Sequence, residues 1–127
     1  ELGHLDDQQR IENVVALHGD ARDLAAVLPA RVDTVMIANA FHGVDDQQGL
    51  IEQAAGALHP GGRLIVVNWH DNPRETTTVA GEPRGPPTAL RMTPDQTRDS
   101  VLTGSSFEAV REIDLPPYHY ALVFKRP

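Results

Sequence analysis

Three side chains capable of proton transfer or metal binding, Asp20, His42 and His70, each come shortly after an apolar run of strand length. Carboxylate and imidazole groups act as general bases and bind zinc or iron. In open α/β sheets, ligands bind beyond the carboxyl ends of the strands, so we expect these side chains at one edge of the sheet. Their spacing follows no short paired-ligand pattern, so we expect no metal site.

The apolar runs alternate with segments of helical periodicity, which is typical of an α/β fold. The pattern predicts strands over 14–18, 32–38 and 63–69, and an antiparallel hairpin of strands 107–115 and 118–126 around the Pro-Pro turn. It predicts helices over 21–28, 45–58 and 92–104. Residues 70–90 are rich in Pro, Gly and Thr and lack periodicity, so they are predicted to be a long loop that is either functional or disordered.

Capping signals mark the ends of two of these helices. Asp45 with Gln48 and Thr93 with Gln96 each have the spacing of a capping box, which predicts helix starts at both places. The HPGG stretch at 59–62 predicts the end of the first of these helices, because proline cannot continue a helix and glycine accepts a left-handed turn.

Composition excludes several classes of function. The chain has 127 residues, with 11 Lys and Arg against 18 Asp and Glu, a formal net charge of −7 and no basic tract, so we expect no nucleic-acid partner. Cysteine is absent, and no apolar run has the length of a membrane span. We therefore expect a cytoplasmic protein that has no membrane partner. Because the chain begins with Glu1, we expect the natural N-terminus to lie upstream.

The order of motifs is strand–HGDARDL, strand–NAFHGV, helix–HPGGRLIVVNW, then a loop, a helix and a terminal hairpin. This order resembles class I S-adenosylmethionine-dependent methyltransferases. It is most similar to their small-molecule branch, type 11, which includes enzymes of ubiquinone and menaquinone biosynthesis. The resemblance implies an α/β, Rossmann-like sheet with strand order 3-2-1-4-5-7-6 and an antiparallel C-terminal hairpin. It also implies S-adenosyl-L-methionine as the cofactor and a small molecule as the substrate.

Two diagnostic elements of that family are absent: the glycine-rich loop after the first strand and the acidic residue that ends the second. The resemblance therefore implies that the first two strands are missing, and that residues 1–127 form the C-terminal two-thirds of a single methyltransferase domain. The remaining strands then form a contiguous 4-5-7-6 block and leave the 14–18 strand without its neighbours. We expect one of two outcomes: another segment completes the sheet, or the 14–18 strand pairs elsewhere, as in a homodimer.

The resemblance also assigns roles to residues that follow the strands. The cofactor-binding positions it implies are Gly19, Asp20, Ala21, Asn39, Ala40 and Phe41. Asp20 would accept a hydrogen bond from the adenine amine, and the Ala21 backbone would donate one. From the residues alone, a role for Asp20 as the cap of the helix that follows it is favoured, and the resemblance reverses this preference. His42 is the candidate general base, with a surface histidine that caps or bridges the loop as the alternative.

Three arginines, Arg74, Arg84 and Arg91, lie in or beside the long loop, where the resembled enzymes cover the acceptor. Guanidinium groups there would hold an anionic substrate in a bidentate manner. The alternative is that they offset an acidic surface.

The leading interpretation is methyl transfer to a small molecule by the complete protein, with this chain alone inactive. A short-chain dehydrogenase is disfavoured because no tyrosine precedes a lysine by four residues: Leu122 follows Tyr118 at that distance, and Phe124 follows Tyr120. A non-catalytic methyltransferase-like module that serves dimerisation or regulation stays open as the alternative.

Overall fold

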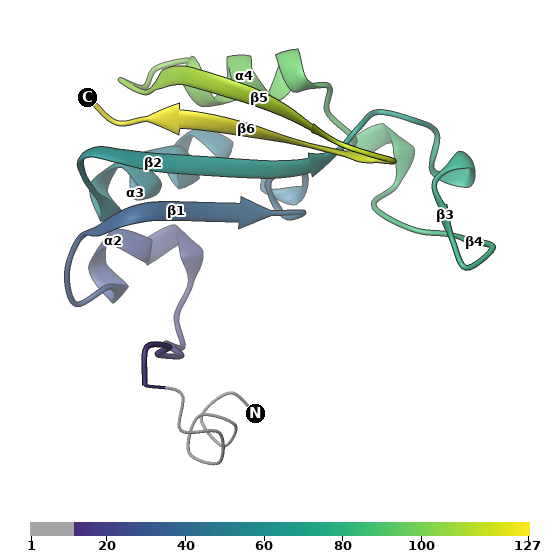
Figure 1. Ribbon diagram of the computed structural model, residues 1–127. Helices are drawn as coiled ribbons and strands as arrows, with labels where there is room; N and C mark the ends of the chain where they lie inside the picture. Colours follow the sequence, from purple (N-terminus) through teal and green to yellow (C-terminus); the bar gives the residue numbers. More distant parts are fainter. Residues whose placement is uncertain (1–11) are drawn as a thin grey trace.

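The structure is a computed structural model that describes residues 12–127. Its main sheet has four strands, β1 (Val32–Ala38), β2 (Leu58–Trp69), β5 (Glu108–Leu115) and β6 (His119–Lys125), in the order β1-β2-β6-β5 (Figure 1). β1 and β2 run parallel, and the β2–β6 and β5–β6 pairs are antiparallel. Both the contiguous strand block and the terminal hairpin expected from the sequence are confirmed. The fold class is α/β, with a Rossmann-like sheet that has four strands in the described residues.

Two helices, α3 (Gln47–Ala57) and α4 (Pro94–Leu102), cover one face of this sheet (Figure 1). The core lies between them and the strands, where apolar side chains are removed from water. Its largest fully buried members are Tyr120, Phe41, Phe124, Ile51, Leu58 and Leu64. On the opposite face, the described residues place no helix over β1, and Met36 is 61% exposed.

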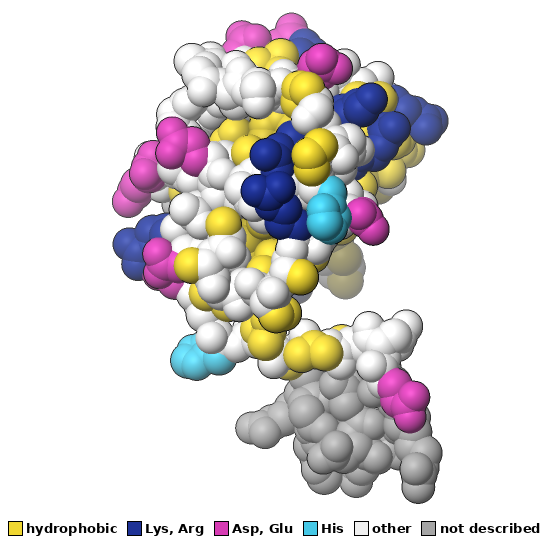
Figure 2. All heavy atoms as spheres, turned by 90° about the vertical axis from the view of Figure 1, so that its left-hand side faces the viewer, with side chains coloured by type: hydrophobic (Ala, Val, Ile, Leu, Met, Phe, Trp, Pro, Cys, Tyr) yellow, Lys and Arg dark blue, Asp and Glu magenta, His cyan; other side chains and the backbone are white. Residues whose placement is uncertain are grey.

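Basic side chains gather at the end of the sheet where β1 begins and β6 ends, as Figure 2 shows from that side. Arg31 precedes β1, Arg63 lies early in β2, and Lys125 and Arg126 follow at the end of β6. Arg63 and Lys125 are opposite one another in the β2–β6 pairing. These cations therefore lie at the end of the sheet opposite to the carboxyl ends of β1 and β2.

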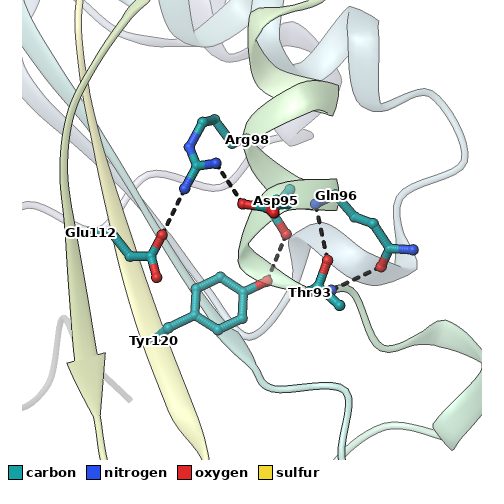
Figure 3. A network of polar contacts seen from close by, with 7 residues as sticks. Thr93, Asp95, Gln96, Arg98, Glu112 and Tyr120 are labelled. Atoms are coloured by element: carbon teal, nitrogen blue, oxygen red, sulfur yellow. Dashed lines mark hydrogen bonds and ion pairs between the residues drawn. The ribbon is translucent and has the colours of Figure 1, made fainter.

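The capping box predicted for α4 is present. The Thr93 hydroxyl accepts from the Gln96 amide at 3.1 Å, and the Gln96 side chain accepts from the Thr93 amide at 2.9 Å (Figure 3). Further along the helix, Arg98 pairs with Asp95 of α4 and with Glu112 of β5, at 2.6 Å each. The helix start is thus fixed locally, while Arg98 joins α4 to the edge strand.

The strand predicted over residues 14–18 is wrong for this chain: the segment forms no strand. Val14, Val15 and Leu17 are 47%, 77% and 51% exposed. A strand requires a neighbour for its backbone hydrogen bonds, and the described residues offer none here. The chain then enters the short helices η1 (Ala21–Asp23) and α2 (Leu24–Val27), close to the helix predicted over 21–28.

Two predicted boundaries of α3 need correction. Its N-cap is Asp46, which accepts from the Gly49 amide at 2.9 Å, rather than Asp45. The helix ends at Ala57, and the HPGG stretch belongs to β2 rather than to a separate helix stop. The reason is that backbone groups in HPGG pair with the end of β6: the Gly61 amide donates to Arg126, and the Gly62 carbonyl accepts from Arg126.

The predicted loop after β2 contains η3 (Arg74–Thr76), the short hairpin β3 (Thr78–Val79) with β4 (Glu82–Pro83), and η4 (Thr88–Leu90). This 74–91 segment projects beyond the sheet (Figure 1). The Tyr118 hydroxyl holds it to the start of β6, donating to the Thr78 carbonyl at 3.0 Å and accepting from the Thr78 amide at 3.2 Å. Across residues 12–127, every helix is too short or too polar to cross a membrane.

Candidate functional site

The carboxyl edge of the sheet, where the parallel strands β1 and β2 end, carries the predicted site residues. The Asn39 amide donates to the Val67 carbonyl at 2.8 Å and so extends the β1–β2 ladder by one bond. Asn39 has φ +58°, a left-handed conformation that asparagine tolerates better than most residues. The chain turns there into η2 (Phe41–Gly43), which leads to α3.

A hollow of about 330 Å³ at this edge joins the two stretches that the sequence analysis singled out. Asp20, Ala21 and Arg22 line one side of it, and Val44, Asp45, Asp46 and Leu50 line the other. The end of the 14–20 segment and the loop after β1 therefore lie side by side. The apolar walls and the carboxylates around them are suited to a flat ligand that carries hydrogen-bond donors.

Asp20 is held by its neighbour Arg22. Its carboxylate accepts from the Arg22 amide at 2.9 Å and from the Arg22 guanidinium at 2.6 to 3.1 Å. These hydrogen bonds lower the pKa of Asp20 to about 2. Asp20 is thus an anion at neutral pH and caps η1, which is the alternative that the residues alone suggested. Because it also lines the hollow, capping and ligand contact do not exclude one another.

Gly19 is required by close packing. A Cβ atom at this position would lie 2.9 Å from Cγ2 of Val27, so a larger residue would push the chain off α2. Gly19 therefore allows Asp20 and Ala21 to reach the hollow.

The loop after β1 divides its side chains between the core and the edge. Phe41 is fully buried in the core cluster, and its carbonyl accepts from the Gln47 side chain at 3.1 Å. The Ala40 carbonyl accepts from the Gly43 amide at 3.2 Å. Of the predicted cofactor-binding residues in this loop, Phe41 therefore anchors the loop through its side chain, while Asn39 and Ala40 are exposed.

His42 follows Phe41 and is partly buried. Burial lowers the pKa of the His42 imidazole, and the nearby positive charge of Arg91 lowers it further. The neutral imidazole favoured by this environment is the form that accepts a proton.

His70 follows β2 and turns toward the hairpin. Its Nε2 lies 3.0 Å from a carboxylate oxygen of Asp114 on β5, and its ring stands 5.0 Å from the ring of Tyr120. Within residues 12–127, no three His, Asp or Glu side chains come close enough together to hold a metal ion.

The three arginines proposed for substrate contact differ in their surroundings. Arg74 donates through Nε to the Gly85 carbonyl at 3.0 Å, and Arg84 pairs with Glu82 at 3.1 Å. Arg91 is only 6% exposed, and its guanidinium carbon lies 5.1 Å from the centre of the Trp69 ring.

The far wall of the hollow is formed by four residues that were not predicted as site residues: Val44, Asp45, Asp46 and Leu50. Asp45 and Asp46 directly follow the NAFHGV stretch, and this proximity is the one signal that was available. The spacing of Asp45 and Gln48 predicts helix capping only, and in the structure Asp46 is the residue that caps α3.

Comparisons with known proteins also point to methyltransferases. A family model described as a methyltransferase domain matches residues 3–66, half of the chain. Among solved structures, a protein from Sulfolobus solfataricus described as a type 11 methyltransferase superposes with a TM-score of 0.67 at 28% identity, over 96% of this chain and 64% of that one.

Two further structures share the fold at lower identity. A SAM-dependent methyltransferase from Aquifex aeolicus gives a TM-score of 0.74 at 16% identity, over 97% of this chain and 60% of that one. The N-methyltransferase NodS from Bradyrhizobium japonicum, in complex with S-adenosyl-L-homocysteine, gives a TM-score of 0.64 at 14% identity, over 99% of this chain and 61% of that one. The chain thus spans less than two thirds of each of these proteins. A search of curated proteins finds no match.

Proposed function

Because the chain belongs to the methyltransferase domain family, we propose that the protein containing it transfers a methyl group from S-adenosyl-L-methionine to a small-molecule acceptor. The observation that carries this proposal is the hollow that Asp20 and Ala21 share with Val44 and Leu50 at the carboxyl edge. Ligands of open α/β sheets bind at this edge.

The residues of the hollow fit the nucleoside half of that cofactor. Ala21, Val44 and Leu50 provide apolar surface for a purine ring, and Asp20 provides a carboxylate that stays ionised above pH 2. An ionised carboxylate accepts a hydrogen bond from an exocyclic amine, and the Ala21 amide is a suitable donor to a ring nitrogen. The glycine-rich loop that holds the methionine half in the family is not found in this sequence, so this chain alone supplies part of the pocket.

The contribution of the described residues to catalysis is positioning and proton removal. S-adenosyl-L-methionine supplies a methyl group already activated on a sulfonium centre, so alignment of the acceptor contributes most of the rate acceleration. Asn39 and Ala40, which are exposed after β1, are proposed to contact the cofactor. His42, whose pKa is lowered by burial and by Arg91, is the candidate base for an acceptor that must lose a proton.

A ligand titration of the isotopically labelled chain tests the proposed pocket. We expect S-adenosyl-L-homocysteine at about 1 mM to shift the backbone amide signals of Ala21, Arg22, Val44 and Asp46. Binding should be weak, because half of the pocket is missing. Asp20→Asn should weaken it further, while Asp33→Asn, at the opposite end of β1, serves as the matched control and should leave it unchanged.

Two results would contradict the proposal. If the shifted signals map to the basic end of the sheet instead of the hollow, the assigned pocket is wrong. If calorimetry shows low-micromolar binding by this chain, then the glycine-rich loop is not needed, and the inference of a partial pocket fails.

A further inference from the structure

Arg91 is a buried cation without a carboxylate partner. Its side chain is 6% exposed, and among residues 12–127 no carboxylate oxygen lies within 4.0 Å of its guanidinium. Removing a charge from water is strongly unfavourable unless it is paired, and a buried arginine is usually matched by an anion. This makes Arg91 unlike Arg22, Arg84 and Arg98, which all form ion pairs.

The hydrogen bonds of Arg91 leave one nitrogen unused. Nε donates to the Pro86 carbonyl at 3.1 Å, and Nη2 donates to the Thr77 hydroxyl and the Arg84 carbonyl at 3.0 Å each. Nη1 is buried and has no partner in the described part of the chain. Two charged N–H groups thus stay unsatisfied, although buried donors are paired in nearly all proteins.

The surroundings of Arg91 are positive. The charge of Arg74 disfavours the charged form of Arg91, and Arg91 in turn lowers the pKa values of His42 and His119. The negative charge of Glu75 offsets part of this effect at Arg91. The immediate surroundings of the Arg91 guanidinium therefore favour an anion.

We propose that Arg91 is an anion-binding residue and that the methyl acceptor is an acidic small molecule whose carboxylate binds Nη1. The identification of the anion as the acceptor rests on the proposed function, whereas the anion site itself does not. Arg91 is near enough to His42 to influence its charge, so a carboxylate bound there would bring the rest of an acceptor close to the candidate base. Arg74 and Arg84 are less suited to bind an anion. Arg74 already donates to the Gly85 and Pro83 carbonyls, and Arg84 is paired with Glu82.

Anion binding requires a small movement of the 74–91 segment, because Nη1 is covered. Gly85 packs tightly over the guanidinium: a Cβ at this position would lie 2.8 Å from both Arg91 Nη2 and Trp69 Cε2. We expect an anion that reaches Nη1 to move the Arg91 guanidinium relative to the Trp69 ring, whose centre lies 5.1 Å from Cζ of Arg91. Trp69 is the only tryptophan of the chain, so its fluorescence reports on this event.

The test is a fluorescence titration of the chain with benzoate, and with benzamide as the neutral isostere. We expect a saturable change with benzoate and none with benzamide. Arg91→Gln should weaken benzoate binding at least about tenfold, because it removes a charge-assisted pair. Arg111→Gln is the matched control, since it removes an exposed guanidinium of β5 that has no assigned role in binding, and it should bind like the original chain.

A purely structural role for Arg91 would give different results. If Arg91 only ties the 74–91 segment to Trp69, benzoate and benzamide will give the same response, and the proposal is overturned. If Arg91→Gln does not fold, Arg91→Lys replaces it as the test variant. Lysine keeps the positive charge but lacks the planar guanidinium, so this variant should bind benzoate more weakly than the original chain. Unchanged binding would also overturn the proposal. Because no cofactor is present, these outcomes are independent of the S-adenosyl-L-homocysteine titration.

Discussion

The phenolic oxygen of Tyr120 lies 2.6 Å from Oγ1 of Thr97, and both side chains are fully buried between β6 and α4. The Tyr120 hydroxyl also lies 2.7 Å from the Met92 carbonyl, to which it donates. Asn68 of β2 donates to Thr97 at 3.1 Å and to Tyr120 at 3.4 Å. A polar network thus joins two strands to α4 inside an apolar core.

Tyr120→Phe should destabilise the chain, because it removes a buried hydroxyl that donates to the Met92 carbonyl and accepts from the buried Asn68 side chain. The expected loss in the free energy of unfolding is about 1–3 kcal/mol. Urea denaturation followed by circular dichroism measures it. Tyr118→Phe is the matched control: its hydroxyl bonds to the exposed Thr78 backbone, where water can replace it, so the loss should be smaller. Equal losses in the two variants would show that the buried hydroxyl stabilises the chain no more than the exposed one.

This network marks the limit of what the sequence could predict about the core. The strands over 32–38 and 63–69 were predictable, because continuous apolar runs are a local signal. Asn68 and Tyr120 are 52 residues apart, and each is a polar residue within an apolar run, so no periodicity in the sequence predicts their hydrogen bond. Strand order came from the family resemblance rather than from the pattern.

The site, like the core, was only partly predictable from the sequence. That Asp20 and the loop after β1 share one edge follows from a general property of parallel sheets. Spacing could not show that Phe41 points into the core, since that depends on how η2 packs. The prediction of a strand over 14–18 was wrong for a related reason. These residues have strand propensity, but a strand also needs neighbouring strands, which local sequence does not reveal.

Thr93→Ala should weaken α4, because the Thr93 hydroxyl satisfies the Gln96 amide at the helix start. The expected loss in the free energy of unfolding is about 0.5–2 kcal/mol. Thr103→Ala is the control at the other end of α4: its hydroxyl bonds the Asp99 carbonyl on the exposed surface, and its removal should change stability by less than about 0.5 kcal/mol. A larger effect at Thr103 than at Thr93 would contradict this assignment.

Asp20 should titrate well below its ordinary value. The structure lowers the pKa of Asp20 from 3.8 to about 2, chiefly through the Arg22 hydrogen bonds. Because the folded pKa is depressed, the resulting stabilisation is present above pH 3.8 and is lost as the pH falls toward 2. Carbon-13 NMR of the side-chain carboxyl measures the midpoint, which Arg22→Ala should raise toward 3.8. An unchanged midpoint in that variant would mean that Arg22 is not the cause.

His42 should be largely neutral at pH 7, because burial and the charge of Arg91 both lower its pKa from 6.5. The unfolded chain binds this proton more readily than the folded one, so folding becomes less favourable as the pH falls below 6.5, until His42 is protonated in the folded state as well. The midpoint, followed by NMR of the imidazole ring, should lie below 6.5 and should rise in Arg91→Gln. Arg84→Gln, which removes a charge from the same segment, should leave it in place. A midpoint at or above 6.5 in the original chain would remove the support for His42 as a neutral base at physiological pH.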